Sequence, residues 1–383
     1  MAGLYIHIPF CESRCIYCGF YSTISLNLRN EYIEALGTEM RLRPIEKALG
    51  EETTIETIYL GGGTPSQLTS SQLYRLFEHI KANYGKHLSK HPEITMECNP
   101  DDITPKLCHA IAQLPINRIS MGAQTFCDER LRFLHRRHNS EEVVQAVKKL
   151  REIGIRNISI DMMFGFPNES LDEWKQDIEK AIQLDVEHIS AYSLMYEEGT
   201  RLYNMLEKKQ VNEIDEDTYR QMYETLIDLL IKSGYEHYEI SNFARKGFRS
   251  QHNSNYWNET PYIGLGAAAH SYVRKPLVTR SWNVDNIKEY IQKISLGELP
   301  SEQEQLSLNT RFNDLITTAL RTSEGIHLRR AEKEFGEDIY QWLLREAEKH
   351  ITLGLMQIKD DRLSLTRKGL YISDDIMSDF MIV

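Results

Sequence analysis

Apolar segments alternate with amphipathic segments through the first half of the chain, and this alternation constrains the fold most strongly. The expected strands cover residues 4–8, 55–60, 93–97, 118–121, 158–163 and 188–194. The segments 28–49, 71–84, 106–113, 141–153 and 171–184 carry apolar residues at helical spacing. Repeated strand-then-helix units predict a parallel sheet with crossover helices, either open or closed into a barrel.

Chemically unusual residues follow the ends of these strands. They are the cysteine-rich CESRCIYC, the glycines at 61–63, Glu97 with Asn99, Gln124 and Asp161. Functional groups collect at the carboxyl ends of parallel strands in both sheet forms. The strand interiors read as mostly apolar, so core packing explains such residues poorly. We therefore predict a common pocket at this edge of the sheet.

Cys11, Cys15 and Cys18 are spaced so that their thiolates can converge on one iron-sulfur cube. Protein-bound [4Fe-4S] clusters usually have four Cys ligands, so three would leave one iron open for another molecule. Catalytic metal sites keep such an open position. Spacing alone also allows structural zinc, with His7 just upstream, or three unligated thiols.

The length of 383 residues allows one large domain and a smaller one. We expect domains at 1–300 and 301–383. Only six Cys occur, and three form one cluster, which indicates a reducing compartment rather than a disulfide framework. The start lacks a signal-peptide pattern, and no segment approaches the ~20 apolar residues of a membrane span. We expect a cytoplasmic protein with at most peripheral membrane association.

The net charge of -11 argues against a general nucleic-acid surface, because phosphate binding relies on clustered Lys and Arg. The short basic run of Arg130, Arg132, Arg136 and Arg137 is interpreted mostly as a solvated helix face. We expect no nucleic-acid partner.

The second half is less regular. Residues 218–233 predict a helix and 235–242 a strand, whereas HNSNYW at 252–257 and the Gly-rich 264–270 are expected mostly as loop. From about residue 300, helices at 311–322, 328–335 and 339–353 precede a β-hairpin at 355–358 and 363–365. This order predicts a small winged-helix-like module, without support for DNA binding.

Individual residues at the strand ends allow several roles. A glycine run lets the backbone approach a ligand closely, although it also suits a tight turn. Glu97 and Asp161 could accept hydrogen bonds from ribose hydroxyls or an amine, and Arg136 could hold a carboxylate. Each of these charged residues taken alone is more often an ordinary ion-pair partner.

Five segments together resemble one known family. YIHIPFCESRCIYCGF, YLGGGTPS, MECNPDD, SMGAQTF and SIDMMFGFP resemble the radical S-adenosylmethionine proteins related to oxygen-independent coproporphyrinogen III oxidase. The resemblance covers nearly the whole chain. It implies a partial (β/α)6 barrel with a small, helical, winged-helix-like C-terminal domain. It also implies a [4Fe-4S] cluster on the three cysteines, whose free iron chelates S-adenosylmethionine for cleavage to a 5′-deoxyadenosyl radical.

The resemblance further implies roles for single residues. It assigns Tyr5, Gly63 and Glu97 to the cluster-bound S-adenosylmethionine. A second set matches positions that contact a second such molecule in the oxidase: Tyr17, Thr64, Pro65, Gln124, Arg136, Asp161 and Met195. These residues could serve two molecules, one molecule or an altered site.

The chain departs from the oxidase at two places. It has Cys18-Gly19-Phe20 where the oxidase has CGC, and it carries HNSNYW. Both features look like the HemW branch of haem chaperones, where an HNxxYW element is associated with haem binding. An imidazole can ligate haem iron and aromatic rings can cover the macrocycle. Without the family context, His252 would be read as a loop histidine beside core aromatics.

We therefore expect a haem chaperone with His252 as the haem ligand. Its partners would be haem and acceptor proteins, such as respiratory haemoproteins, and a homodimer is left open. The rival expectation is an enzyme that oxidatively decarboxylates coproporphyrinogen III. Radical modification of tRNA is disfavoured by the acidic balance.

Overall fold

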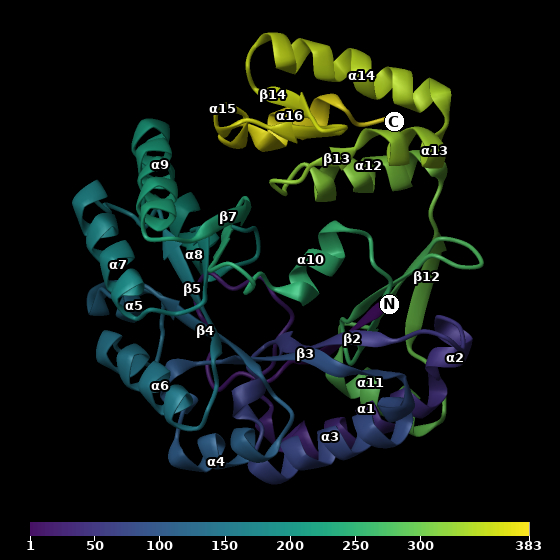
Figure 1. Ribbon diagram of the computed structural model, residues 1–383. Coiled ribbons are helices and arrows are strands. Elements are labelled where there is room, and N and C mark those ends of the chain that lie inside the picture. The colour runs from purple at the N-terminus through teal and green to yellow at the C-terminus, as the bar shows by residue number, and fades with distance from the viewer. Residues whose placement is uncertain (383) are drawn as a thin grey trace.

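The computed structural model describes residues 1–382, and its centre is one twelve-stranded sheet (Figure 1). Six strands, neighbours in sequence order, run parallel. They are β1 (Ala2–Ile8), β2 (Ile55–Gly62), β3 (Leu88–Cys98), β4 (Arg118–Gln124), β5 (Asn157–Phe164) and β6 (His188–Ser193). This order confirms the six predicted units.

The six strands form a partial barrel. Among residues 1–382, β1 pairs with β9 (Tyr262–Leu265) rather than with β6. The sheet then continues antiparallel through β10 (His270–Val273), β11 (Thr279–Asn283) and β12 (Ser301–Gln305). At its other edge, β6 pairs with β8 (Asn242–Ala244), which pairs with β7 (Glu236–Glu239).

Helices cover the outer face of the barrel, and their sequences contain clear start signals (Figure 1). Capping boxes begin α3, α6 and α7, where the N-cap and N3 side chains each bond the other residue's backbone N–H. The outer helices are α1 (Arg29–Leu42), α3 (Ser70–Tyr84), α4 (Pro105–Gln113), α5 (Asp128–Phe133), α6 (Ser140–Glu152), α7 (Leu171–Gln183) and α11 (Ile287–Ser295). Connecting helices are α2 (Ile45–Ala48), α8 (Arg201–Glu207) and α9 (Glu216–Lys232).

The strands differ from the sequence-based expectation that their interiors are mostly apolar. Side chains that face the helices are apolar, such as Ile58, Met96 and Ile119 in the main core. The alternate positions, which face the barrel interior, are largely polar. They include Tyr5, Tyr59, Thr95, Glu97, Arg118, Ser120, Asp161 and Ser190. The strands therefore follow the period-two pattern of a sheet with two different faces.

Three segments differ from the predicted elements. Residues 251–257 form helix α10 (Gln251–Trp257) and not a loop, because Ser250 caps its N-terminus. The expected helix at 28–49 is interrupted at Pro44, which lacks the N–H that a helix interior needs. The expected strand at 235–242 is the β7–β8 pair, with a turn between them.

The C-terminal part folds around its own core on one side of the barrel (Figure 1). Its helices are α12 (Leu308–Ala319), α13 (Leu328–Phe335), α14 (Glu337–Thr352), α15 (Arg367–Leu370) and α16 (Ser373–Asp379). Its sheet contains β13 (Ile326–His327), β14 (Met356–Lys359) and β15 (Arg362–Leu365). Because β12 still pairs with β11, we propose that the domain boundary follows Gln305.

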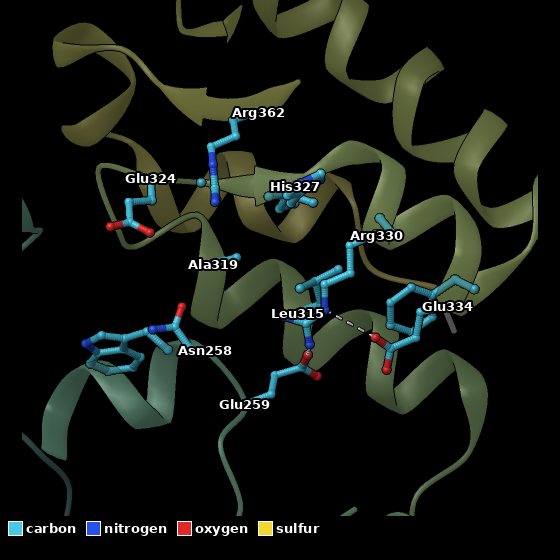
Figure 2. Close-up of a pocket in the computed structure, with 14 residues that line it drawn as sticks. Asn258, Glu259, Leu315, Ala319, Glu324, His327, Arg330, Glu334 and Arg362 are labelled. Atoms are coloured by element: carbon cyan, nitrogen blue, oxygen red, sulfur yellow. Dashed lines mark hydrogen bonds and ion pairs between the residues drawn. The ribbon is translucent and has the colours of Figure 1, made fainter. Parts of the chain in front are cut away.

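Helix α10 lies between the barrel and this C-terminal part (Figure 1). Glu259, just after α10, accepts from Arg330 at 2.8 Å (Figure 2). It also accepts from Arg274 at 3.0 Å. Glu334 bonds Arg274 and Arg311. We call these five residues the interdomain ion network. No helix among residues 1–382 is long and apolar enough to cross a membrane.

Candidate functional site: a cavity at the carboxyl ends of the barrel strands

A cavity of about 430 Å³ opens at the carboxyl ends of the strands, within the usual size range of small-molecule sites. Its lining includes all the predicted site residues except Pro65 and His252. These are Tyr5, Cys11, Cys15, Tyr17, Cys18, Gly63, Thr64, Glu97, Gln124, Arg136, Asp161 and Met195. The polar strand ends therefore meet in one pocket, as the sheet argument predicts.

The cysteine loop is tied to the barrel at several backbone points. The Cys11 N–H donates to the Thr23 carbonyl at 2.9 Å, and the Ile16 N–H donates to the Leu134 carbonyl at 3.2 Å. Cys11 Sγ lies 3.5 Å from Thr64 Oγ1, and Arg136 Nη1 donates to Cys15 Sγ at 3.7 Å. All three thiols line the cavity, so they can share a ligand that enters from it.

The three thiols offer the donor set of a cluster with three protein ligands. None of them is in a disulfide, and all three line the cavity. An iron-sulfur cube binds each Cys to a different iron, so its ligands do not meet at one point. The donor set therefore fits a [4Fe-4S] cluster with one iron free.

The glycine run has a packing role as well as a place in the cavity wall. A Cβ on Gly63 would lie 2.6 Å from the Pro9 carbonyl carbon, and one on Gly62 would collide with the His7 ring. Gly62 also has φ +107°, which side chains disfavour. The run thus lets the end of β2 lie directly beside the start of the cysteine loop.

Glu97 is held at the cavity wall by two donors. Tyr59 Oη donates to its Oε1 at 2.7 Å, and the Gly62 N–H donates to its Oε2 at 3.1 Å. Burial raises the pKa of Glu97 to about 7, and Asp161 adds to this shift. Burial also raises the pKa of Asp161, to which Ser120 Oγ donates at 3.3 Å. Such carboxylates gain from a cationic or hydroxyl-bearing ligand.

Arg136 crosses the cavity wall with part of its hydrogen-bonding capacity unused. Its Nη2 donates to Asn99 Oδ1 and to the Gly122 carbonyl, both at 2.7 Å. Its buried Nε has no partner among the described atoms. A guanidinium left in this state fits an anionic ligand group, such as a carboxylate.

Arg137 holds the cysteine loop, a role that the sequence interpretation missed. It bonds Glu12 of the loop and lies 2.9 Å from both Asp101 Oδ2 and Asp102 Oδ1. Asp102 is itself fixed by Ser66 Oγ at 2.6 Å. The expected solvated helix face is therefore wrong for Arg136 and Arg137. Their position relative to the loop after β3 is a tertiary feature without a sequence signal.

His252 lies outside the cavity lining, beneath its floor. The residue is 1% exposed, and its ring stacks on Tyr59 with centroids 5.0 Å apart. Nδ1 lies 2.8 Å from Thr57 Oγ1 and Nε2 lies 2.9 Å from Tyr256 Oη. Burial lowers the pKa of His252 to about 3, so the ring is neutral, as an iron ligand must be. Both nitrogens are nevertheless engaged, and this conformation does not fit a haem iron at His252.

Two other predicted residues occupy distinct places. Pro65 begins a buried one-turn 3₁₀ helix after β2 and shapes the wall from behind. Met195 stands at the cavity mouth and is 57% exposed. The sequence interpretation also missed the lining residues Tyr59, Ser120, Ser190 and Tyr192. The alternation of polar and apolar residues within the strands was the signal that could have identified them.

Comparison with known proteins agrees with this geometry. Residues 5–181 match the model of the radical SAM superfamily, and residues 306–372 match that of the HemN C-terminal domain. The heme chaperone HemW of Bacillus subtilis is 34% identical over 387 residues, covering 100% of this chain and 99% of that protein. The chain belongs to the HemW family.

Other relatives of this HemW family member agree in length or fold. The heme chaperone HemW of Lactococcus lactis is 32% identical, covering 99% of this chain and 97% of that protein. The solved structure of coproporphyrinogen III oxidase (HemN) from Escherichia coli has a TM-score of 0.83 at 21% identity. It covers 99% of this chain and 89% of that chain, which confirms the predicted radical SAM fold with its C-terminal domain. Radical SAM membership implies a [4Fe-4S] cluster and S-adenosylmethionine, and the cavity fits both.

Proposed function

We propose that this HemW family member is a haem chaperone, which binds haem and delivers it to acceptor haemoproteins such as respiratory ones. The observation that carries the proposal is the full-length match to proteins named heme chaperone HemW, at 34% and 32% identity. The family comparison is supported by the cavity, which gathers the residues of both implied cofactors. We propose a cytoplasmic location, at most peripheral contact with membranes, no nucleic-acid partner and possible homodimerisation.

In the proposed loaded state, Cys11, Cys15 and Cys18 hold the cluster. The cluster supplies an electron that can cleave the sulfonium of S-adenosylmethionine. Tyr5, Gly63 and Glu97 face the first S-adenosylmethionine, and Glu97 accepts hydrogen bonds from its cationic or hydroxyl groups. Burial raises the pKa of Glu97 to about 7, so a cationic partner favours the ionised carboxylate.

The second set of residues contributes the remaining walls. Arg136 offers its unpartnered Nε to an anionic group, while Asp161 and Gln124 offer oxygen acceptors. Tyr17, Thr64 and Met195 line the cavity towards the loop and the mouth, with Pro65 behind them. We propose these seven residues as contacts of one or two S-adenosylmethionine molecules.

We propose His252 as a haem ligand only in a state where helix α10 has moved. Its Nε2 must first give up Tyr256 Oη, which lies 2.9 Å away. The Gln251 and His252 N–H groups donate to Glu93 at 3.1 and 3.0 Å and hold the start of α10 in place. Ligation by His252 thus requires these contacts to break.

A haem titration of the full chain tests the proposal. We expect the Soret band to shift with saturation, and the loaded protein to pass its haem to an apo-haemoprotein. The same titration of His252→Ala tests the ligand, with Asn258→Ala, exposed at the end of α10, as a matched control. Unchanged binding in His252→Ala would remove His252 from the proposal, and no shift in the native chain would refute the chaperone function.

The second candidate is oxidative decarboxylation of coproporphyrinogen III. It is favoured by the complete set of cluster and S-adenosylmethionine residues around one cavity. Anaerobic incubation of the reconstituted protein with coproporphyrinogen III, reductant and S-adenosylmethionine separates the two functions. Accumulation of protoporphyrinogen would overturn the chaperone proposal, and we expect none.

A further inference from the structure

The mouth of the cavity exposes apolar side chains, whereas the cavity floor is polar. Phe20 is 73% exposed, Met195 is 57% exposed and Tyr192 is 42% exposed, and all three line the opening. We call these three residues, together with the exposed Arg14 on the same opening, the mouth patch. Exposed apolar side chains around one opening commonly mark a binding surface.

Two segments far apart in sequence supply the apolar residues of the mouth patch, and Arg14 comes from between the first two cysteines. One follows the third cysteine at Gly19 and Phe20, and the other continues from the end of β6 through residues 192–197. The two segments touch directly, because a Cβ on Gly19 would collide with the Glu197 carboxylate. The patch is therefore a product of the tertiary fold.

Buried contacts support the patch from below. Ile16, Met163 and Leu194 belong to one small core cluster, against which Tyr17 and Tyr196 pack. The Leu202 N–H donates to the Ile16 carbonyl at 2.9 Å, and the Leu194 N–H donates to the Phe164 carbonyl at 2.8 Å. Ile16 and Leu194, which flank the patch in sequence, are thus held by the core.

The mouth patch combines three kinds of group. Phe20 and Tyr192 offer aromatic surface, and Met195 offers a thioether, which is a known axial ligand of haem iron. Arg14 offers a guanidinium that can bind carboxylates. Haem presents the complementary set, since it has an apolar macrocycle, an iron with open axial positions and two propionates.

We propose that haem docks on the mouth patch with Met195 as an iron ligand and Arg14 beside the propionates, while α10 stays in place. This inference rests on the proposed haem-binding function. It applies to the state in which His252 is enclosed, being 1% exposed with both ring nitrogens engaged. Haem at the mouth also covers the cavity, so its binding and that of S-adenosylmethionine affect each other.

The competing assignment treats Met195 only as a contact of S-adenosylmethionine. In that case, changes at the mouth patch alter the affinity for S-adenosylmethionine and leave haem binding as it was. Met195→Leu separates the assignments, because leucine keeps the apolar bulk and removes the thioether. Phe20→Ser removes aromatic surface at a position that is already exposed, so both variants are expected to fold.

The experiment is a ferric haem titration of the full chain by absorbance, with folding checked by circular dichroism. We expect the native protein to show the near-infrared charge-transfer band of thioether-ligated haem. Met195→Leu should lose that band and bind about tenfold more weakly, and Phe20→Ser about threefold more weakly. Leu353→Ser, at a residue 67% exposed just after α14, is the control and should match the native protein.

Two results would overturn the proposal, and they are distinguishable. If the native chain binds haem but Met195→Leu and Phe20→Ser keep its spectrum and affinity, haem does not dock on the mouth patch, while the chaperone function stands. If the native chain gives no Soret shift at all, the chaperone function fails, and the docking site fails with it.

Discussion

The cavity wall and the His252 ring are both polar parts of the barrel interior, but Arg136 in the wall and His252 differ in whether their nitrogens have partners. In the cavity wall, Arg136 Nε and Asp101 Oδ1 are buried without a partner among the described atoms. Around His252, Thr57 and Tyr256 engage both ring nitrogens, and Glu93 accepts two backbone N–H groups. Buried polar groups left unpaired are costly, so Arg136 suits a ligand, whereas the paired ring of His252 suits a supporting role. Trp257, in the same helix as His252, still has a buried Nε1 without a partner among the described atoms.

This comparison bears on the HNSNYW segment. His252 attracts attention as an isolated candidate ligand, yet its contacts are those of a residue that anchors a helix. Trp257, at the other end of α10, lies under the Arg321 guanidinium at 5.2 Å from the ring centroid. The helix therefore connects the barrel floor to the C-terminal part. Changes in each region should have different consequences.

The largest expected effect is at the cysteine loop. Cys15→Ser removes one of three cluster ligands, and we expect reconstituted protein to lose nearly all its iron and sulfide and its visible cluster absorbance. Folding should persist, because Cys15 is not part of the main core. Cys127→Ser, at a residue outside the cavity lining, is the control. Full iron content in Cys15→Ser would contradict the cluster assignment.

The next largest effect is expected in the interdomain ion network. Glu259→Gln leaves Arg274 and Arg330 without this buried carboxylate, and we expect a loss of about 2 kcal/mol in unfolding free energy. Amide exchange in 251–260 should speed up, while cluster content stays unchanged. The exposed pair of Arg220 and Asp217 supplies the control Asp217→Asn. If amide exchange in 251–260 speeds up in Asp217→Asn but not in Glu259→Gln, the network does not support α10.

Glu97 allows a pH test of the cavity. Burial raises the pKa of Glu97 in the folded chain to about 7, above the unfolded value of about 4.3. The contribution of Glu97 to stability is therefore complete only below the unfolded pKa. That contribution is lost as pH rises to 7. We expect Glu97→Gln to raise the unfolding free energy of the cofactor-free chain at pH 8 by about 2 kcal/mol, with little change at pH 4.5.

Thermal melts at the two pH values measure this difference. Glu169, whose pKa burial also raises to about 7, keeps its own pH dependence in the variant. A Glu97→Gln chain that melts as the native chain does at both pH values would show that Glu97 carries no such penalty.

The smallest effect is expected for the ion pairs of Arg137 with Glu12, Asp101 and Asp102. Arg137→Gln removes the ion pairs through which Arg137 links Glu12 of the loop to Asp101 and Asp102. We expect a chelator to remove the cluster from this variant about fivefold faster. This corresponds to about 1 kcal/mol, which suits partly exposed ion pairs. Arg132→Gln on α5 is the control. Equal rates of cluster loss in the two variants would show that the ion pairs of Arg137 do not hold the loop.

Much of the fold was predictable because local rules and tertiary structure agree. The six strands, the helices with capping boxes and the convergence of Glu97, Gln124 and Asp161 all follow from periodicity and parallel topology. The misses have physical causes. Helix α10 depends on the Ser250 cap and on Glu93 from a distant strand, and the polar inner face was hidden by the apolar alternate residues.

The sequence by itself determined the cysteine spacing, the order of strands and helices, and the family. These properties are carried by neighbours in the chain, whose spacing sets which groups share a face or follow a strand. Only the tertiary structure decided that Arg137 clasps the cysteine loop, that His252 is enclosed by Thr57 and Tyr256, and that Phe20 meets the segment at 192–197. Contacts between distant segments depend on how the elements pack, and no local pattern specifies them.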